Sequence, residues 1–199
     1  MGITQNGPTA IVNWADFSIG LGQQVDIHQP GAGAALLNRV TGANPSRLLG
    51  NLNANGRVYL VNPNGVLVGP DAKINAASFM ATTAHITDAG FLAGGDQHFS
   101  GGSDASVVNL GVIKANQGDA VLVGTRVVNK GRIEAPKGTA ALAAATEFVY
   151  SPLGDDAVTV VSKGGARKGE VGVDNAGLMD AAQAQLKAAD GNLYSLAVN

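Results

Sequence analysis

Short apolar runs separated by turn residues recur along almost the whole chain. Residues 58–61 (Val-Tyr-Leu-Val) and 66–68 (Val-Leu-Val) are two such runs, and Asn-Pro-Asn-Gly stands between them at 62–65. Runs rich in β-branched and aromatic residues, bounded by turn residues, predict β-strands. Asparagine and proline suit the first two positions of a type I turn, so 62–65 predicts a tight corner. Strands that alternate with tight turns, without helices, are typical of a chain coiled into stacked rungs.

The N-terminal part continues this pattern. Residues 11–19, 25–27 and 34–41 predict strands, and 53–56 (Asn-Ala-Asn-Gly) predicts a second corner. That corner lies too close to 62–65 for a full rung, so the two are either corners of one rung or the ends of one hairpin.

A repeat in the second half shows how the rungs stack. Residues 107–115 (VVNLGVIKA) recur about 20 residues later as 127–135 (VVNKGRIEA), and a third copy stands at 173–181 (VDNAGLMDA). The copies place the same residue types at the same corner positions: Asn109, Gly111, Asn129, Gly131, Asn175 and Gly177. The stretch 61–67 fits this template with one additional residue, which would align Asn62 with these asparagines.

The period and the three short strands in each unit predict an all-β fold, a parallel β-helix. We expect it to be right-handed, because crossovers between parallel strands almost always are. A single rung cannot bury its apolar side, so equivalent residues of successive rungs must stack, and asparagine side chains can then hydrogen-bond along the stack.

We expect one domain over residues 1–199. Residues 1–35 predict an N-terminal cap in which Trp14 and Phe17 close the end of the core, 36–105 carry the corner segment and a glycine-rich loop excursion at 88–103, and 106–199 form regular rungs. Val198-Asn199 begins a further copy, which indicates a longer solenoid.

Two segments predict small helices. Residues 44–50 have asparagine as a cap, proline first inside and glycine at the end, which indicates one helical turn. Residues 181–189 are rich in alanine, glutamine and lysine and precede Gly191, which predicts a short helix bulging from a rung.

The amino-acid composition excludes several kinds of site and partner. The chain is 45% hydrophobic but only 5% aromatic, so its core must be aliphatic, and its charged fraction of 14% is low. It has no cysteine, which excludes disulfides, thiolate catalysis and zinc–cysteine sites. The net charge of -2 gives no reason to expect nucleic acid as a partner. No run predicts a membrane span, and Met1-Gly2-Ile3 does not begin a signal peptide. We therefore expect a cytoplasmic protein or a mature fragment with a replacement start methionine.

The motifs carry a family resemblance. Residues 38–42, 45–50 and 53–66 resemble the secretion domain of two-partner secretion exoproteins, the filamentous-haemagglutinin-like N-terminal domain. The shared motif is Asn62, Pro63, Asn64, Gly65 and Val66. Residues 11–14, 17–20 and Val25 are similar to the early strands of that family. A second family motif, Asn-Pro-Asn-Leu, has no counterpart here, since residues 29–32 read Gln-Pro-Gly-Ala, and the usual opening strands and signal peptide do not precede Gly2.

The resemblance implies a non-enzymatic role without a cofactor. Such domains stand at the N-terminus of large adhesins, haemagglutinins or cytolysins of Gram-negative bacteria. They cross the periplasm largely unfolded, are recognised by the POTRA domains of an outer-membrane β-barrel transporter, fold outside and nucleate the β-helix of the passenger that follows. The implied location is the cell surface or the medium, and the passenger is the part that would meet a host receptor or glycan.

Other candidate chemistry is sparse. His28, His85 and His98 lack metal-ligand spacing, so we expect surface or corner histidines. Asp155-Asp156 predicts a solvated turn, and the basic cluster Lys163, Arg167 and Lys168 predicts a solvated loop or a contact for an acidic partner.

Three alternatives stay open. The Asn62–Gly65 segment predicts a structural corner, a transporter contact or both. A polysaccharide-binding or polysaccharide-lyase β-helix would need carboxylates and basic residues along one strand face, and the sequence does not single out such a face. A plain structural or ligand-binding repeat module is the third possibility.

Overall fold

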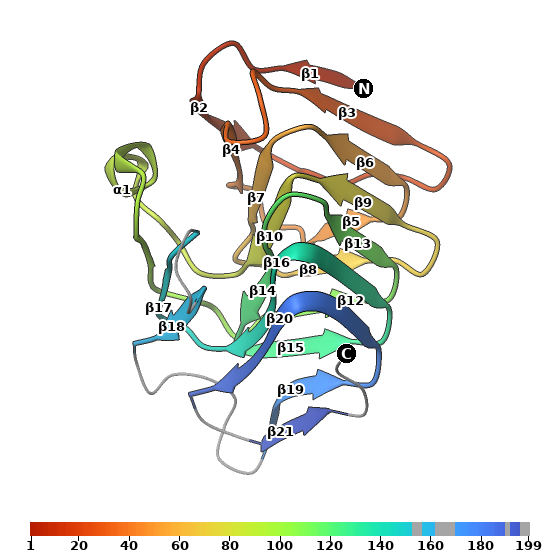
Figure 1. Ribbon diagram of the computed structural model, residues 1–199, viewed down its shortest axis with the longest axis vertical. Coiled ribbons are helices and arrows are strands. Elements are labelled where there is room, and N and C mark those ends of the chain that lie inside the picture. Colours follow the sequence, from red (N-terminus) through yellow and green to blue (C-terminus); the bar gives the residue numbers. More distant parts are fainter. Residues whose placement is uncertain (153–156, 162–169, 190–191, 196–199) are drawn as a thin grey trace.

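The fold is a parallel β-helix whose rungs stack along one axis (Figure 1). The computed structural model describes residues 1–152, 157–161, 170–189 and 192–195. Each full rung contributes a strand segment to each of three faces, which we call face 1, face 2 and face 3. Parallel pairing joins like faces of successive rungs, so the predicted fold class is confirmed.

The strands fall into the three faces as follows. Face 1 contains β1 (Gly2–Thr4), β3 (Gln24–His28), β6 (Asn51–Ala54), β9 (Lys73–Ala76) and β13 (Val112–Ala115). Face 2 contains β2 (Thr9–Trp14), β4 (Ala35–Val40), β7 (Arg57–Val61), β10 (Ser78–Thr82) and β14 (Ala120–Gly124). Two long strands, β16 (Arg132–Ala144) and β20 (Leu178–Ala188), run through both faces and join them into one sheet. Face 3 contains β5 (Ser46–Leu48), β8 (Val66–Val68), β12 (Ser106–Asn109), β15 (Arg126–Asn129), β19 (Val171–Asn175) and β21 (Asn192–Ser195).

The register follows the sequence repeat. Val108 pairs with Val128 in face 3, and Leu122 pairs with Leu142 in face 2. The corners at 53–56 and 62–65 belong to one rung, because β6 and β7 pair with neighbouring rungs and not with each other.

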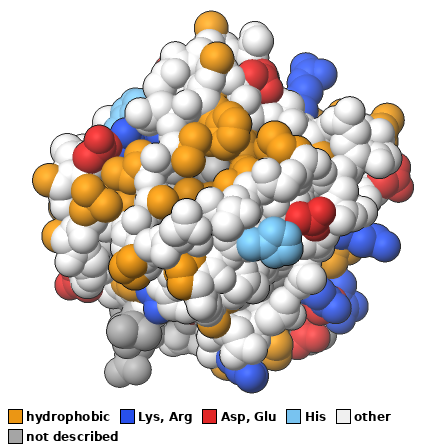
Figure 2. Space-filling view, turned by 90° about the horizontal axis from the view of Figure 1, so that it is seen from above, with side chains coloured by type: hydrophobic (Ala, Val, Ile, Leu, Met, Phe, Trp, Pro, Cys, Tyr) orange, Lys and Arg blue, Asp and Glu red, His pale blue; other side chains and the backbone are white. Residues whose placement is uncertain are grey.

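The interior core is mainly aliphatic, because alternate strand residues point inward. In β13, Ile113 and Ala115 are buried while Lys114 is exposed. At the N-terminal end, Phe17 is buried and Trp14 lies against it with ring centroids 5.5 Å apart. Figure 2, which views the molecule from that end, shows apolar side chains gathered there.

A second apolar core lies outside the coil. The outer side of face 2 presents Leu37, Tyr59, Met80 and Val121 in neighbouring rungs. A flap covers them, built from α1 (Asp88–Ala93), β11 (Gln97–Phe99), β17 (Phe148–Tyr150) and β18 (Val158–Val160). Its strands pair antiparallel although they come from two excursions far apart in the chain (Figure 1). The excursion expected at 88–103 therefore contains a helix and a strand as well as loop.

Buried polar contacts fasten the flap to the coil. The Tyr150 hydroxyl donates to Asp119 Oδ2 at 2.9 Å, and both side chains are buried. Burial also raises the pKa of Tyr59, which faces Phe91 and Tyr150 under the flap, to about 12.

Both predicted small helices are wrong. Residues 46–48 form β5, in which Ser46 and Leu48 are buried and Arg47 is exposed. Residues 181–188 belong to β20, which pairs with β16, so that Leu186 lies beside Leu142. β5 pairs with β8 of the following rung and β20 pairs with β16 of the preceding rung. In both places the backbone hydrogen bonds of the sheet outweigh a modest local helix propensity.

Candidate functional site

The family motif forms the corner between face 2 and face 3, where β7 ends and β8 begins. The Gly65 amide donates to the Asn62 carbonyl at 3.0 Å, which closes the predicted four-residue turn. The Asn62 amide donates to the Thr82 carbonyl of the next rung at 3.0 Å. The corner is therefore closed within its own rung and hydrogen-bonded to the following one.

Asn62 is the centre of this corner, and its side chain has no exposed surface. Its Nδ2 donates to the Asn44 carbonyl and to Ser46 Oγ, each at 3.0 Å. Its Oδ1 accepts from the Asn64 amide at 2.9 Å. A buried amide with its donors and acceptor satisfied stabilises one backbone arrangement and penalises others, because any opening would leave these groups without partners.

The rest of the motif contacts segments from before and after it in the chain. Asn64 Nδ2 donates to the Gly42 carbonyl at 2.8 Å, and Ser103 Oγ donates to the Pro63 carbonyl. Gly65 has φ 103°, a conformation that favours glycine, and a Cβ there would lie 2.9 Å from the Ser106 carbonyl oxygen.

The motif is mostly hidden from solvent. Val66 is buried in the interior core, Asn62 and Gly65 are buried, and Pro63 is half-buried. Only Asn64 is exposed. The folded corner therefore offers a partner little more than one amide.

The repeated asparagines form a different structure at the opposite end of face 3, on the corner that leads into face 1. Asn109 Nδ2 donates to Asn129 Oδ1 at 2.8 Å, and Asn129 Nδ2 donates to Asn175 Oδ1 at 2.7 Å. All three side chains have no exposed surface. They make a ladder of amides inside the stack.

The glycines beside this ladder allow the rungs to approach closely. A Cβ on Gly131 would lie 2.1 Å from the Gly111 carbonyl oxygen, and a Cβ on Gly177 would lie 2.2 Å from that of Gly131. These are backbone atoms that cannot move aside without disturbing the stack, so only glycine fits this column.

Asn62 does not belong to the asparagine ladder, and its predicted alignment with Asn109 is wrong. The register pairs Val66 with Val107 and Val68 with Asn109, which leaves Val68 as the counterpart of Asn109 on the motif-bearing rung. Similar patterns occur at both ends of face 3, Val-Asn-x-x-Gly-Val at 61–66 and Val-Asn-x-Gly-Val at 108–112, and each corner holds a buried asparagine and a glycine. The additional residue in the first pattern was the sign that the two corners are different.

The remaining candidates lie apart from these corners. His28 ends β3, His85 bridges to Ser100, and His98 Nε2 lies 3.1 Å from Glu147 Oε1. The described part of the chain has no group of three His, Asp or Glu residues placed to hold a metal ion. Asp155-Asp156 and the basic cluster Lys163, Arg167 and Lys168 lie outside the described residues. Within the described ranges, no helix has the length and apolar character needed to cross a membrane.

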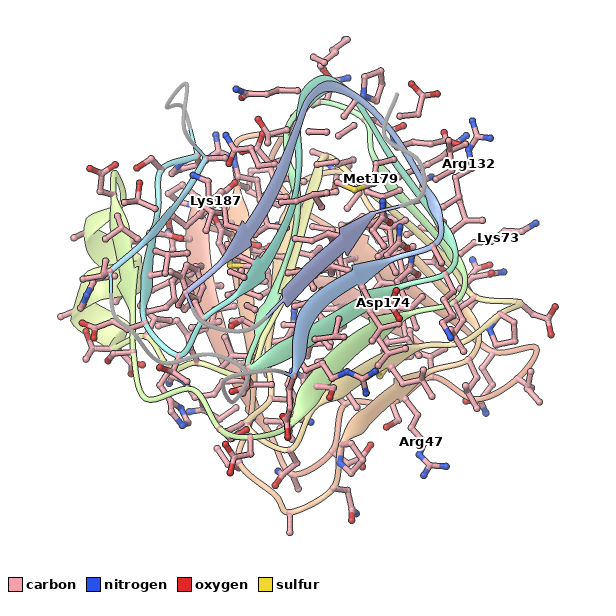
Figure 3. The ribbon with its side chains drawn as sticks, turned by 90° about the horizontal axis from the view of Figure 1, so that it is seen from below. Arg47, Lys73, Arg132, Asp174, Met179 and Lys187 are labelled. Atoms are coloured by element: carbon pink, nitrogen blue, oxygen red, sulfur yellow. The ribbon has the colours of Figure 1, made fainter. Side chains whose placement is uncertain are left out.

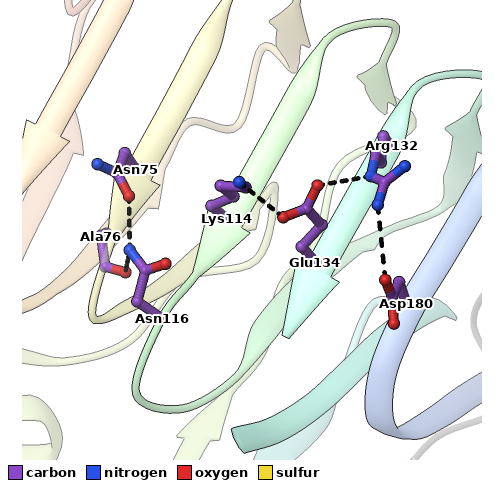
Figure 4. Close-up of polar contacts among 7 residues, drawn as sticks. All are labelled: Asn75, Ala76, Lys114, Asn116, Arg132, Glu134 and Asp180. Atoms are coloured by element: carbon purple, nitrogen blue, oxygen red, sulfur yellow. Dashed lines mark hydrogen bonds and ion pairs between the residues drawn. The ribbon is translucent and has the colours of Figure 1, made fainter. Parts of the chain in front are cut away.

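Sequence reasoning missed a polar strip on the outer side of face 1. Parallel pairing brings the outward residues of successive rungs into one column, namely Asp26, Asn53, Asn75, Lys114, Glu134 and Asp180. Glu134 lies 2.9 Å from Lys114 Nζ and 2.5 Å from Arg132 Nε, and Arg132 also reaches Asp180 at 3.5 Å (Figure 4). Partial burial opposes ionisation of Glu134, but the hydrogen bonds and charges of Lys114 and Arg132 leave its pKa lowered. Carboxylates and basic residues do therefore share one strand face.

The chain is similar to known proteins in sequence and in fold. Residues 1–193 match the family described as the TPS secretion domain. A heme/hemopexin-binding protein of Haemophilus influenzae is 35% identical over 197 residues, which cover 94% of this chain and 21% of that protein. A second Haemophilus influenzae protein of the same description is 46% identical over 83 residues, which cover 42% of this chain and 9% of that protein. The chain thus spans about one fifth of the length of the first relative and less of the second.

A solved structure gives the same picture. The crystal structure of the HMW1 secretion domain from Haemophilus influenzae superposes with a TM-score of 0.69 and 26% sequence identity. The match covers 92% of this chain and 53% of the other. The structural similarity therefore extends over most of this chain.

Proposed function

Because this chain belongs to the family of TPS secretion domains, we propose that it directs a two-partner secretion exoprotein to its outer-membrane transporter and then starts the folding of that exoprotein outside the cell. The partner in the first step is the set of POTRA domains on the transporter, and the partner in the second is the passenger that continues the same chain. The product reaches the cell surface or the medium. No catalytic step is part of this role.

One observation supports a division between the two steps, namely the burial of the motif. Asn62, Gly65 and Val66 are inaccessible once the corner has formed. A transporter that reads these side chains must therefore do so before folding. We assign the motif to folding: its hydrogen bonds hold the first complete rungs together, and we call this set of contacts the corner lock. Recognition by the transporter we assign to the unfolded chain.

The end of the stack supports the nucleating role. β20 pairs with β16 on one side, and Ala184 and Leu186 are only partly buried although they pack against the interior core. A further rung would cover these side chains and add parallel backbone hydrogen bonds. In a solenoid, stability grows by such nearest-neighbour additions, so a folded stack lowers the barrier for the next rung.

The test separates recognition from folding. The chain is placed after a signal peptide, fused to a reporter and co-produced with its candidate transporter. We expect the reporter outside the cell with the intact chain and in the periplasm when residues 1–199 are deleted. Asn62→Ala should still be captured by isolated POTRA domains but give a protease-sensitive product, whereas Asn64→Ala should behave as the parent. Secretion that survives the deletion would rule out the proposed role, and loss of POTRA capture by Asn62→Ala alone would move the motif to recognition.

The kind of exoprotein has two candidates. The resemblance to filamentous-haemagglutinin-like domains favours an adhesin. The two relatives described as heme/hemopexin-binding proteins favour an exoprotein that binds heme and hemopexin, since one of them aligns over 94% of this chain. Binding of heme and hemopexin by the full-length exoprotein, compared with its adhesion to host cells, distinguishes the two.

A further inference from the structure

The outer side of face 1 is hollowed along the first rungs. Two adjoining depressions share Asn53 and Asn75, one of about 510 Å³ and one of about 230 Å³. We call them together the face 1 groove. Figure 3 shows Lys73 and Arg132 on this side of the molecule, pointing outward. The flap covers the outer side of face 2, so it leaves this groove open.

The groove is lined by side chains with unused hydrogen-bonding capacity. Asn53 Nδ2 donates to Asp26 Oδ1 at 3.0 Å, and Asn75 Oδ1 accepts from Asn116 Nδ2 at 2.5 Å. Each of these amides is held by one bond and keeps its other polar atom available. The side chains of Asn51 and Lys73 contact no polar partner within the described residues. The groove therefore presents donors and acceptors together, at the rung spacing of about 4.8 Å.

The charge of the larger depression is positive although that of the chain is negative. Its lining carries Lys73, Lys114 and Arg132 against the single carboxylate of Glu134, while the whole chain has a net charge of -2. Glu134 is shared between Lys114 and Arg132, and Arg132 also reaches Asp180 at 3.5 Å. The carboxylate of Asp26 lines the smaller depression, where it accepts from Gln24 and Asn53. Among the residues that the structure describes, Lys73 forms no ion pair, and it lines the depression together with the amides of Asn51 and Asn53.

We propose that the face 1 groove binds an acidic glycan, a chain of sugar units that carry carboxylate groups. Sugar hydroxyls both donate and accept hydrogen bonds, as the amides of Asn51, Asn53 and Asn75 do, and a sugar carboxylate complements Lys73. An extended acidic peptide fits less well, because the strands that line the groove are paired on both sides and leave no strand edge for a peptide backbone. The site is independent of the secretion role and of the buried corners.

The first measurement titrates the 199-residue chain with tetragalacturonate and, as the neutral control, with maltotetraose, and follows the side-chain amide signals by NMR. We expect tetragalacturonate to shift the signals of Asn51, Asn53 and Asn75, and maltotetraose to shift them less or not at all. Raising the ionic strength should weaken binding, because the contribution of Lys73 is exposed and screened by salt.

Variants sharpen the assignment. Lys73→Glu should lower the affinity for tetragalacturonate about fivefold or more, because it replaces an attraction at an exposed site by a repulsion. The matched control is Arg126→Glu, which makes the same change of charge at an exposed position of face 3 and should leave the affinity unchanged. Asn51→Ala tests the amide contribution without a change of charge and should also weaken binding.

Four results would overturn the proposal: no shift of the three asparagine signals by tetragalacturonate, equal affinity for maltotetraose, equal affinity for tetraglutamate, and an equal loss with Arg126→Glu. Secretion of the Lys73→Glu chain is expected at the parent level. Failure of glycan binding therefore leaves the proposed secretion role untouched, and the reverse also holds.

Discussion

The two ends of face 3 solve the same problem in different ways. At the end where β8 begins, Asn62 bonds to Asn44, Ser46 and Asn64, and Ser103 closes over the turn. At the other end, Asn109, Asn129 and Asn175 bond mainly to one another along the axis. The first arrangement occurs once in the part of the chain that the structure describes, and it joins segments that are far apart in the sequence. The second is modular, since each rung adds an identical unit.

The difference indicates a division of labour within one fold. A solenoid must first overcome the entropy of ordering several rungs before stacking becomes favourable. A corner that fixes residues 42–46, 62–66 and 103 together stabilises such a starting unit. A ladder of like amides then specifies the register of each later rung. Substitutions at the two corners should therefore differ in their cost and in how far along the stack their effects extend.

Gly131→Ala should cause the largest loss, about 4 kcal/mol in the free energy of unfolding, because its Cβ would meet three backbone atoms of the preceding rung within 3 Å. Urea denaturation followed by circular dichroism measures the change. Gly31→Ala, at a loop position where a Cβ meets nothing within 4 Å, is the control and should change stability little. Equal effects of the two would show that the rungs do not need close approach at the ladder corner.

Asn62→Ala should cost about 3 kcal/mol, because it leaves Ser46 Oγ, the Asn44 carbonyl and the Asn64 amide without their buried partner. Hydrogen exchange should show lost protection across β5 and β8 together, since the corner joins both. If protection from exchange is lost only at residues 62–65, the corner does not hold β5 and β8 together.

Asn129→Ala should cost about 2 kcal/mol by removing the middle of the ladder. Here we expect lost protection only in β12, β15 and β19, measured by the same hydrogen-exchange experiment. If protection is also lost in β5, the asparagine ladder and the Asn62 corner do not differ in how far their effects extend.

Ser103→Ala should cost about 1 kcal/mol, because its hydroxyl donates to the Pro63 carbonyl from a segment that returns after the flap excursion. The measurement is again urea denaturation. Combining it with Asn62→Ala should give less than the sum of the two losses, since both act on one corner. Strict additivity would mean that Ser103 does not belong to the lock.

Asn64→Ala should have the smallest effect, below about 0.5 kcal/mol, because this side chain is exposed although it donates to the Gly42 carbonyl. It is the matched control for Asn62→Ala within the same turn. If Asn64→Ala lowers the free energy of unfolding as much as Asn62→Ala does, the corner is stabilised by its exposed side chain and not by its buried amide.

Sequence reasoning succeeded where the repeat runs without interruption. Val108 and Val128 stand in consecutive copies of equal length, so the pairing could be read directly from the period. It failed where insertions change the spacing. Asn75 and Asn116 are neighbours in space but 41 residues apart in the chain, because the first flap excursion lies between them. The polar strip of face 1 was therefore invisible to a search for local spacing.

The helix predictions failed for a related reason. Residues 181–189 have good local helix formers, but their conformation is decided by the exposed edge of β16, which cannot be recognised without the register. The corner motif shows the opposite case. Its turn conformation follows from asparagine, proline and glycine locally, whereas the burial of Asn62 depends on Asn44 and Ser46.

The flap has a consequence for the order of events at the cell surface. The outer side of face 2 is complete from β4 to β14 by residue 124, yet β17 and β18, which shield it, lie at 148–160. In a chain that emerges from its N-terminus onward, α1 and β11 are present by then, but this apolar surface stays partly uncovered until β17 and β18 have followed. Truncated chains that end before residue 160 should aggregate, and the shortest soluble fragment should include β18 of the flap.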